Sequence, residues 1–194
     1  MQCRRFPFRD RGEGYCLFND LAVAVAVLRG ETPLRRFLIL DLDVHQGNGT
    51  AALFSADPEV FTLSLHAAHN YPLHKERSTL DVELPDGCDD AHFLARLAEV
   101  LEPALDAHRP EFVLYQAGVD GLREDRLGHL ALTHEGLMER DRRVLAACRA
   151  RRLPVAVTLG GGYGRPLEAT VRAHANVWRV MRATLPAPGS LRRS

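Results

Sequence analysis

One stretch of the chain, residues 37–49 (FLILDLDVHQGNG), turns from apolar to polar without losing its alternation. Its apolar start is typical of a strand buried in a parallel sheet. Asp41, Asp43 and His45 follow at spacing i, i+2, i+4, so on an extended chain their side chains lie on one side. Burying two carboxylates and an imidazole together is costly unless a cation compensates them. The pattern therefore predicts a metal or phosphate site, with structural capping by the aspartates as the alternative.

Composition sets broad limits on the class of protein. The chain has 194 residues, an apolar fraction of 46% and zero formal net charge, which favours one globular domain and gives no indication of nucleic-acid binding. We see no apolar run of about 18 residues for a membrane span and no signal peptide. The four cysteines form no CxxC pair, so we expect a cytoplasmic location. Oligomeric state is left open.

Strand and helix patterns alternate along the chain. A helix capped by Asn19 is apolar on all sides, so we expect it to be buried. Residues 66–87 lack a helical period and contain two prolines, which predicts a long loop, and residues 186–194 are expected to form a loose tail. The remaining patterns are strands at 37–43, 59–65, 111–116 and 153–159, helices capped by Asp89 or Asp90 and by Thr133, and a last helix with Pro166 in its first turn. This alternation predicts an α/β fold, a parallel sheet with helices on both faces.

Polar residues follow three of the predicted strands. In open parallel sheets, sites form beyond the carboxyl ends of the strands. Asp43 and His45 follow one strand, Asp120 follows another, and Tyr163 follows a third inside a glycine run. The three strand ends are therefore expected to bring these side chains to one edge of the sheet.

This set of residue types indicates a catalytic metal site. Asp43, His45 and Asp120 would provide three ligands and leave one position open, as catalytic zinc sites do. A metal there would polarise a carbonyl and acidify a water molecule. Tyr163 could donate a hydrogen bond to a developing oxyanion. The alternatives are a turn-forming Asp120 and a Tyr163 that packs on the surface.

Several segments occur in the order of a known family. The segments are Arg11-Gly-Glu-Gly-Tyr-Cys16, Asp41-Leu-Asp-Val-His-Gln-Gly-Asn-Gly-Thr50, Gln116-Ala-Gly-Val-Asp120, Asp125-Arg-Leu-Gly128 and Leu159-Gly-Gly-Gly-Tyr163. Together they resemble the zinc-dependent histone deacetylase family over about residues 8–184. Gln46 and Asn48 resemble the class IV branch and its bacterial relatives.

The resemblance implies an arginase/deacetylase-type fold and a metal-dependent deacylase acting on acetylated lysine of a protein or on a small-molecule amide. It implies that Asp43, His45 and Asp120 bind Zn²⁺, with Fe²⁺ as an alternative, and that Tyr163 stabilises the oxyanion. The implied substrate-binding residues are Tyr15, Gly161 and Gly162. The implied structural K⁺ site comprises Asp41, Asp43, His45, Ser64 and Leu65, partly through backbone carbonyls.

One departure from the family pattern affects catalysis. The family carries a tandem histidine pair that serves as general base and proton relay. Counting back from Arg11 places that pair at Arg5 and Phe6, and no histidine precedes His45. A positioned general base contributes about 10²–10⁴-fold in rate. We therefore expect impaired activity, and we expect residues 1–194 to be one partial domain, incomplete at its N-terminus.

Two other functions are consistent with parts of the pattern. A catalytically inactive module could bind acyl-lysine without cleaving it, as the missing histidine pair suggests. A magnesium-dependent phosphohydrolase could use Asp41 and Asp43, but His45 argues against it because Mg²⁺ prefers oxygen ligands.

Overall fold

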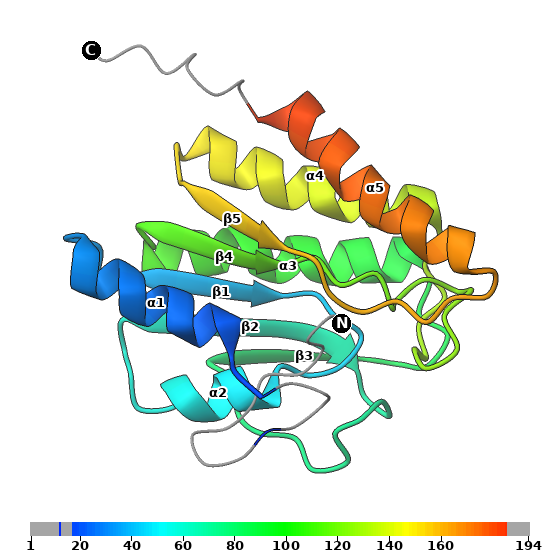
Figure 1. Cartoon of the computed structure of the whole chain (residues 1–194), viewed down its shortest axis with the longest axis horizontal. Coiled ribbons are helices and arrows are strands. Elements are labelled where there is room, and N and C mark those ends of the chain that lie inside the picture. The colour runs from blue at the N-terminus through cyan, green and yellow to red at the C-terminus, as the bar shows by residue number, and fades with distance from the viewer. Residues whose placement is uncertain (1–11, 13–16, 186–194) are drawn as a thin grey trace.

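Five parallel strands form one sheet in the order β3-β2-β1-β4-β5 (Figure 1). The computed structural model describes residue 12 and residues 17–185. The strands are β1 (Phe37–Asp41), β2 (Val60–Ala67), β3 (Leu80–Leu84), β4 (Phe112–Gln116) and β5 (Val155–Thr158). The central strand β1, which leads into the Asp43–His45 segment, lies between β2 and β4. The predicted parallel α/β sheet is confirmed.

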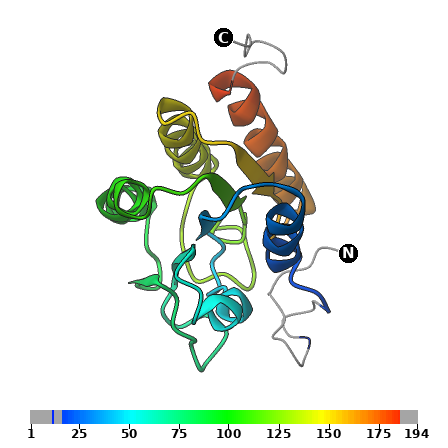
Figure 2. The same ribbon diagram turned by 90° about the vertical axis from the view of Figure 1, so that its left-hand side faces the viewer.

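Helices cover both faces of this sheet, as predicted. They are α1 (Asp20–Glu31), α2 (Asn48–Phe54), α3 (Asp90–His108), α4 (His134–Ala150) and α5 (Leu167–Thr184). Because side chains of a strand alternate between faces, Leu38 and Leu40 join the core formed with α3, α4 and α5. Phe37 and Ile39 join a second core formed with α1 and the end of α2. Figure 2 shows α1 and α3 on opposite sides of the sheet.

The starts of three helices agree with the predicted caps. The side chain of Asn19 accepts a hydrogen bond from the backbone of Ala22, and the carboxylate of Asp89 accepts one from His92. Thr133 accepts one from Gly136. Each cap satisfies a backbone N–H that the first helical turn leaves without a partner, which is why these residue types mark helix starts.

The burial predicted for α1 is wrong. Leu21 and Val25 are buried, but Val23 and Val27 are 52% and 47% exposed. Residues four apart lie on the same face of a helix, so one face of α1 packs on the sheet while these two valines point outward. An all-apolar sequence cannot indicate which of its faces meets the core.

Two elements differ from the sequence prediction. The predicted long loop at 66–87 contains β3, which pairs in parallel with β2 at the edge of the sheet. Its residues alternate, with Val82 and Leu84 buried. Helix α2 begins directly after the His45 segment, with Gly47 at its N-cap position.

The predicted tail at 186–194 lies outside the described residues. Among the described helices, none is long and apolar enough to cross a membrane.

Candidate metal centre

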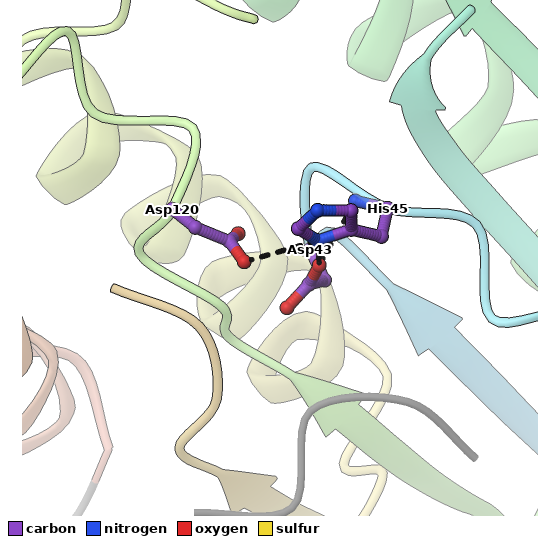
Figure 3. A group of neighbouring side chains, drawn as sticks. All are labelled: Asp43, His45 and Asp120. Carbon is purple, nitrogen blue, oxygen red and sulfur yellow. Dashed lines mark hydrogen bonds and ion pairs between the residues drawn. The ribbon is translucent and has the colours of Figure 1, made fainter. Parts of the chain in front are cut away.

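The sheet brings Asp43, His45 and Asp120 together. Asp43 and His45 lie just after β1, and Asp120 lies just after β4. These strands are parallel neighbours that end in register, with Asp41 opposite Gln116. One ligand atom from each of the three residues lies within 4.8 Å of the others (Figure 3). Three ligands on two adjacent strand ends form a compact set suited to one ion.

The imidazole of His45 lies between the two carboxylates. Its Nδ1 is 2.9 Å from Asp43 Oδ1 and 3.3 Å from Asp120 Oδ2. Backbone groups hold the carboxylates in place: His45 N–H donates to Asp43 Oδ1, and Val44 N–H donates to Asp120 Oδ1. The other oxygen of each carboxylate, Oδ2, is buried and accepts no hydrogen bond from the described residues.

Those two oxygen atoms test whether a cation fits. A buried carboxylate oxygen without a partner costs about 1–3 kcal/mol or more, since it has lost its hydration. A divalent ion would compensate both oxygens at once, and carboxylate oxygen with imidazole nitrogen is a common donor set for Zn²⁺. The residues present therefore fit a divalent metal.

Protons and a metal ion would compete for this site. Burial lowers the pKa of His45, but its close contacts with Asp120 and Asp43 outweigh burial and raise that pKa to about 9. Burial and the charge of Asp120 raise the pKa of Asp43 to about 6. Burial also acts to raise the pKa of Asp120, but the close approach of His45 lowers it below its usual value. Without an ion, His45 therefore holds a proton in the ligand set.

Two glycines bring backbone against the ligands. A Cβ on Gly118 would lie 2.7 Å from Asp43 Oδ2, and a Cβ on Gly161 would lie 2.3 Å from the carboxyl carbon of Asp120. Gly161 has φ +60 and Gly162 has φ +109, which favour glycine. The loop after β5 thus lies against the ligand set. The substrate-binding role of Gly161 and Gly162 stays a prediction.

Tyr163 lies in that same loop, and its side chain is 36% exposed. Its backbone N–H donates to the carboxylate of Asp125. Asp125 also accepts hydrogen bonds from Leu127 and Gly128, at 2.8 and 3.0 Å. Asp125 therefore links the loop after β4 to the loop that carries Tyr163, a role that its sequence motif alone did not indicate.

The residues of the expected K⁺ site also lie close together. Asp41 and Ser64 are paired in register on β1 and β2, and both are buried with Leu65. Asp41 Oδ1 accepts a hydrogen bond from the backbone of Asp43. Ser64 Oγ is 2.9 Å from Nδ1 of His66. Ion binding by these groups remains a prediction.

Arg5, Phe6 and the Arg11–Cys16 segment other than Gly12, including Tyr15, lie outside the described residues. Sequence reasoning also missed Arg140, which is fully buried in α4. An arginine within a predicted helix normally lies on its exposed face, so the sequence does not indicate that Arg140 is buried.

A cavity of about 550 Å³ lies away from the ligand set. It lies where α2 leads into β2, and Phe54, Phe61 and Arg77 are among its lining residues. None of the three candidate ligands lines it. Its size therefore gives no reason to move the site from the carboxyl end of the sheet, where the ligand chemistry lies.

Comparisons with known proteins agree with the fold. The family model of the histone deacetylase domain matches residues 7–181. An uncharacterised protein of Picosynechococcus sp. is 46% identical over 175 residues, covering 90% of this chain and 58% of that protein. Histone deacetylase 2 of Arabidopsis thaliana is 34% identical over 157 residues, covering 79% of this chain and 41% of that protein.

Solved structures give the same result. A histone deacetylase homologue from Aquifex aeolicus has a TM-score of 0.79 and 27% identity, covering 93% of this chain and 50% of that chain. An acetylpolyamine aminohydrolase from Burkholderia pseudomallei has a TM-score of 0.72 and 27% identity, covering 88% and 52%. The chain thus spans about half the length of the relatives it matches. With its parallel sheet and its Asp-His-Asp set at the carboxyl edge, the chain belongs to the histone deacetylase family.

Proposed function

We propose that this chain carries the metal centre of a deacylase that hydrolyses N-acetyl or other N-acyl amides of lysine or of a small-molecule amine. Family membership supports deacylase chemistry. The observation that carries the metal dependence is the pair of buried Asp43 and Asp120 oxygen atoms without a hydrogen-bond partner among the described residues, beside His45. When bound, Zn²⁺ or Fe²⁺ would polarise the acyl carbonyl and acidify a water molecule.

The residues of the chain would have separate roles in binding the ion, stabilising the oxyanion and contacting the substrate. Asp43, His45 and Asp120 hold the ion, and Gly118 and Gly161 exclude side chains from the space beside the carboxylates. Tyr163 donates a hydrogen bond to the oxyanion as charge develops on the substrate oxygen. Asp125 holds the backbone of Tyr163. Tyr15 and the Gly161–Gly162 backbone would contact the acyl-lysine chain.

The substrate is an N-acyl amide of an alkyl amine. This class is supported by the named relatives, which include a histone deacetylase and an acetylpolyamine aminohydrolase. The two types of substrate share the acylated amine and differ in the carrier. We further propose that a structural K⁺ site lies next to the ligands, formed partly through backbone carbonyls by Asp41, Asp43, His45, Ser64 and Leu65.

Metal binding and turnover test this function separately. The purified chain is expected to take up one Zn²⁺ and, once loaded, to hydrolyse an acetyl-lysine peptide or an acetylated polyamine. Gly118→Ala should abolish uptake, because its Cβ would collide with Asp43. Gly30→Ala is the matched control, since apart from its chain neighbours and its own helix backbone no atom lies within 4 Å of the added methyl group.

Each outcome has a clear meaning. Removing the ion with a chelator should stop turnover, and Tyr163→Phe should lower kcat by about 10²–10³-fold if the hydroxyl stabilises the oxyanion. A wild-type chain that takes up no divalent ion contradicts the proposal. A chain that holds the ion and binds the acetyl-lysine peptide without cleaving it would instead be an acyl-lysine binding module.

A further inference from the structure

Arg140, on α4, is fully buried beneath the metal centre, although arginine is rarely buried without partners. Its Nη1 donates hydrogen bonds to the carbonyl oxygen of Gly118 at 2.6 Å and to that of Leu42 at 3.3 Å. Its Nε donates to Asp141 Oδ1 at 2.9 Å. One side chain of α4 therefore binds the backbone of two segments that follow different strands, β1 and β4.

Those two backbone segments carry the metal ligands. Leu42 directly precedes Asp43, and Gly118 lies two residues before Asp120. The β1–β4 ladder ends at Asp41 and Gln116, and Leu42 N–H still donates to Gln116 O. Beyond that point the hydrogen bond from Val44 N–H to Asp120 also joins the two segments. The bonds from Arg140 thus hold the segments together where the sheet no longer does.

The charge of Arg140 is compensated locally. Its Nη2 lies 2.8 Å from Asp141 Oδ1, and the Tyr115 hydroxyl donates to the same carboxylate oxygen at 2.5 Å. A lone buried cation would repel a divalent ion nearby, whereas a paired one has a much weaker long-range field. The contribution of Arg140 to the ligand set is therefore directional, through its two hydrogen bonds to carbonyl groups.

We propose that Arg140 is a positioning residue of the metal centre, which fixes the distance between the Asp43–His45 segment and Asp120 through the carbonyl groups of Leu42 and Gly118. This inference rests on the proposed function, because it assigns Arg140 to the same centre. Groups that orient metal ligands without touching the ion typically contribute about 10–100-fold to metal affinity.

Co²⁺ is the probe for the test, because its visible absorption bands report ligand number and geometry. The full chain is titrated with Co²⁺ as wild type and as the double variant Arg140→Met with Asp141→Asn. The second substitution avoids leaving an unpaired buried carboxylate, which alone could unfold the protein. We expect about 10–100-fold weaker Co²⁺ binding and altered visible bands. Thermal unfolding of each metal-free variant is measured in parallel.

Two further variants separate positioning from general stability. Tyr115→Phe removes a hydrogen bond to Asp141 and leaves the carbonyl contacts of Arg140 in place, so it should lower Tm without changing Co²⁺ affinity. Arg140→Lys keeps the charge next to Asp141 but loses the planar fork, so its affinity should lie between wild type and the double variant. If Arg140→Lys folds and binds like wild type, and the folded double variant also does so, the inference is wrong.

The same titration distinguishes failure of the centre from failure of the inference. His45→Ala removes one ligand and should lose Co²⁺ binding whatever the role of Arg140. If wild type and His45→Ala bind Co²⁺ equally weakly, the proposed metal centre fails, and the role of Arg140 fails with it. If His45→Ala alone loses binding, the centre stands and Arg140 has no positioning role.

Discussion

At the scale of single residues, the ligand set is a place where protons and metal compete. His45 Nδ1 faces both Asp43 and Asp120, and a ring nitrogen of His45 is also the candidate ligand atom. The same contacts that orient the ring raise its pKa to about 9 in the metal-free protein. An incoming ion must therefore displace a proton at neutral pH.

This competition predicts a pH-dependent metal affinity. Below the His45 pKa of about 9 the histidine is protonated, so affinity should rise with pH by about tenfold per unit for one displaced proton. Near pH 6, Asp43 adds a second proton and the dependence should steepen. Zn²⁺ competition titrations between pH 6 and 8.5 measure the slope, and calorimetry in buffers of different ionisation enthalpy measures the protons released. An affinity that does not change from pH 7 to pH 8.5 contradicts this expectation.

At the scale of helices and strands, features set by local sequence could be predicted, whereas features set by tertiary packing could not. The caps at Asn19, Asp89 and Thr133 were predictable because they depend on a few neighbouring backbone groups. Strand β3 was not, because an edge strand with polar Asp81 and Glu83 on one face differs little from a loop in sequence. The burial of each α1 residue depends on which face of the helix packs on the sheet, and tertiary packing decides that.

The candidate site shows the same division. The sequence predicted that these side chains gather at one edge of the sheet. Asp43 and His45 are spaced to lie on one side of an extended chain, and Asp120 and Tyr163 each follow the end of another strand. The links made by Asp125 and Arg140 could not be predicted, because each joins a loop or helix to segments distant in sequence. Such contacts follow from the arrangement of the elements and leave no local pattern.

The start of α4 gives a stability prediction at this scale. Thr133 caps α4, and its hydroxyl donates to Asp90 Oδ2 at 2.6 Å. Thr133→Ala removes both hydrogen bonds, so the free energy of unfolding should fall by about 1–2 kcal/mol. Thr133→Ser keeps the hydroxyl and should lose less than half of that. Urea unfolding followed by circular dichroism gives both values, and equal losses in the two variants would show that the cap is unimportant.

At the scale of the whole molecule, apolar surface is exposed beside one edge of the sheet. Within the described residues β5 pairs only with β4, and its four residues are half-buried. On α5, Val171 and Trp178 are 59% and 54% exposed. An edge strand and exposed apolar side chains on a helix each favour association with other polypeptides.

Purified chain is therefore expected to self-associate as its concentration rises. Val171→Glu places a charge in the apolar surface of α5 and should shift sedimentation velocity profiles toward the monomer. Ala183→Glu is the matched control, because it adds the same charge at another exposed position of α5. A wild-type chain that sediments as a monomer at all concentrations would contradict the expectation.

The strand order also determines when the metal centre can form during folding. Strand β1 pairs with β2 after a short connection that contains only α2, but β4 reaches β1 only after α2, β2, β3 and α3. Closing that larger loop costs more chain entropy and makes the β1–β4 pairing slow. Asp43 and His45 lie on one side of this late pairing and Asp120 lies on the other. A nascent chain thus carries an incomplete candidate ligand set until α3 and β4 have docked, so the three side chains cannot meet before β1 and β4 pair.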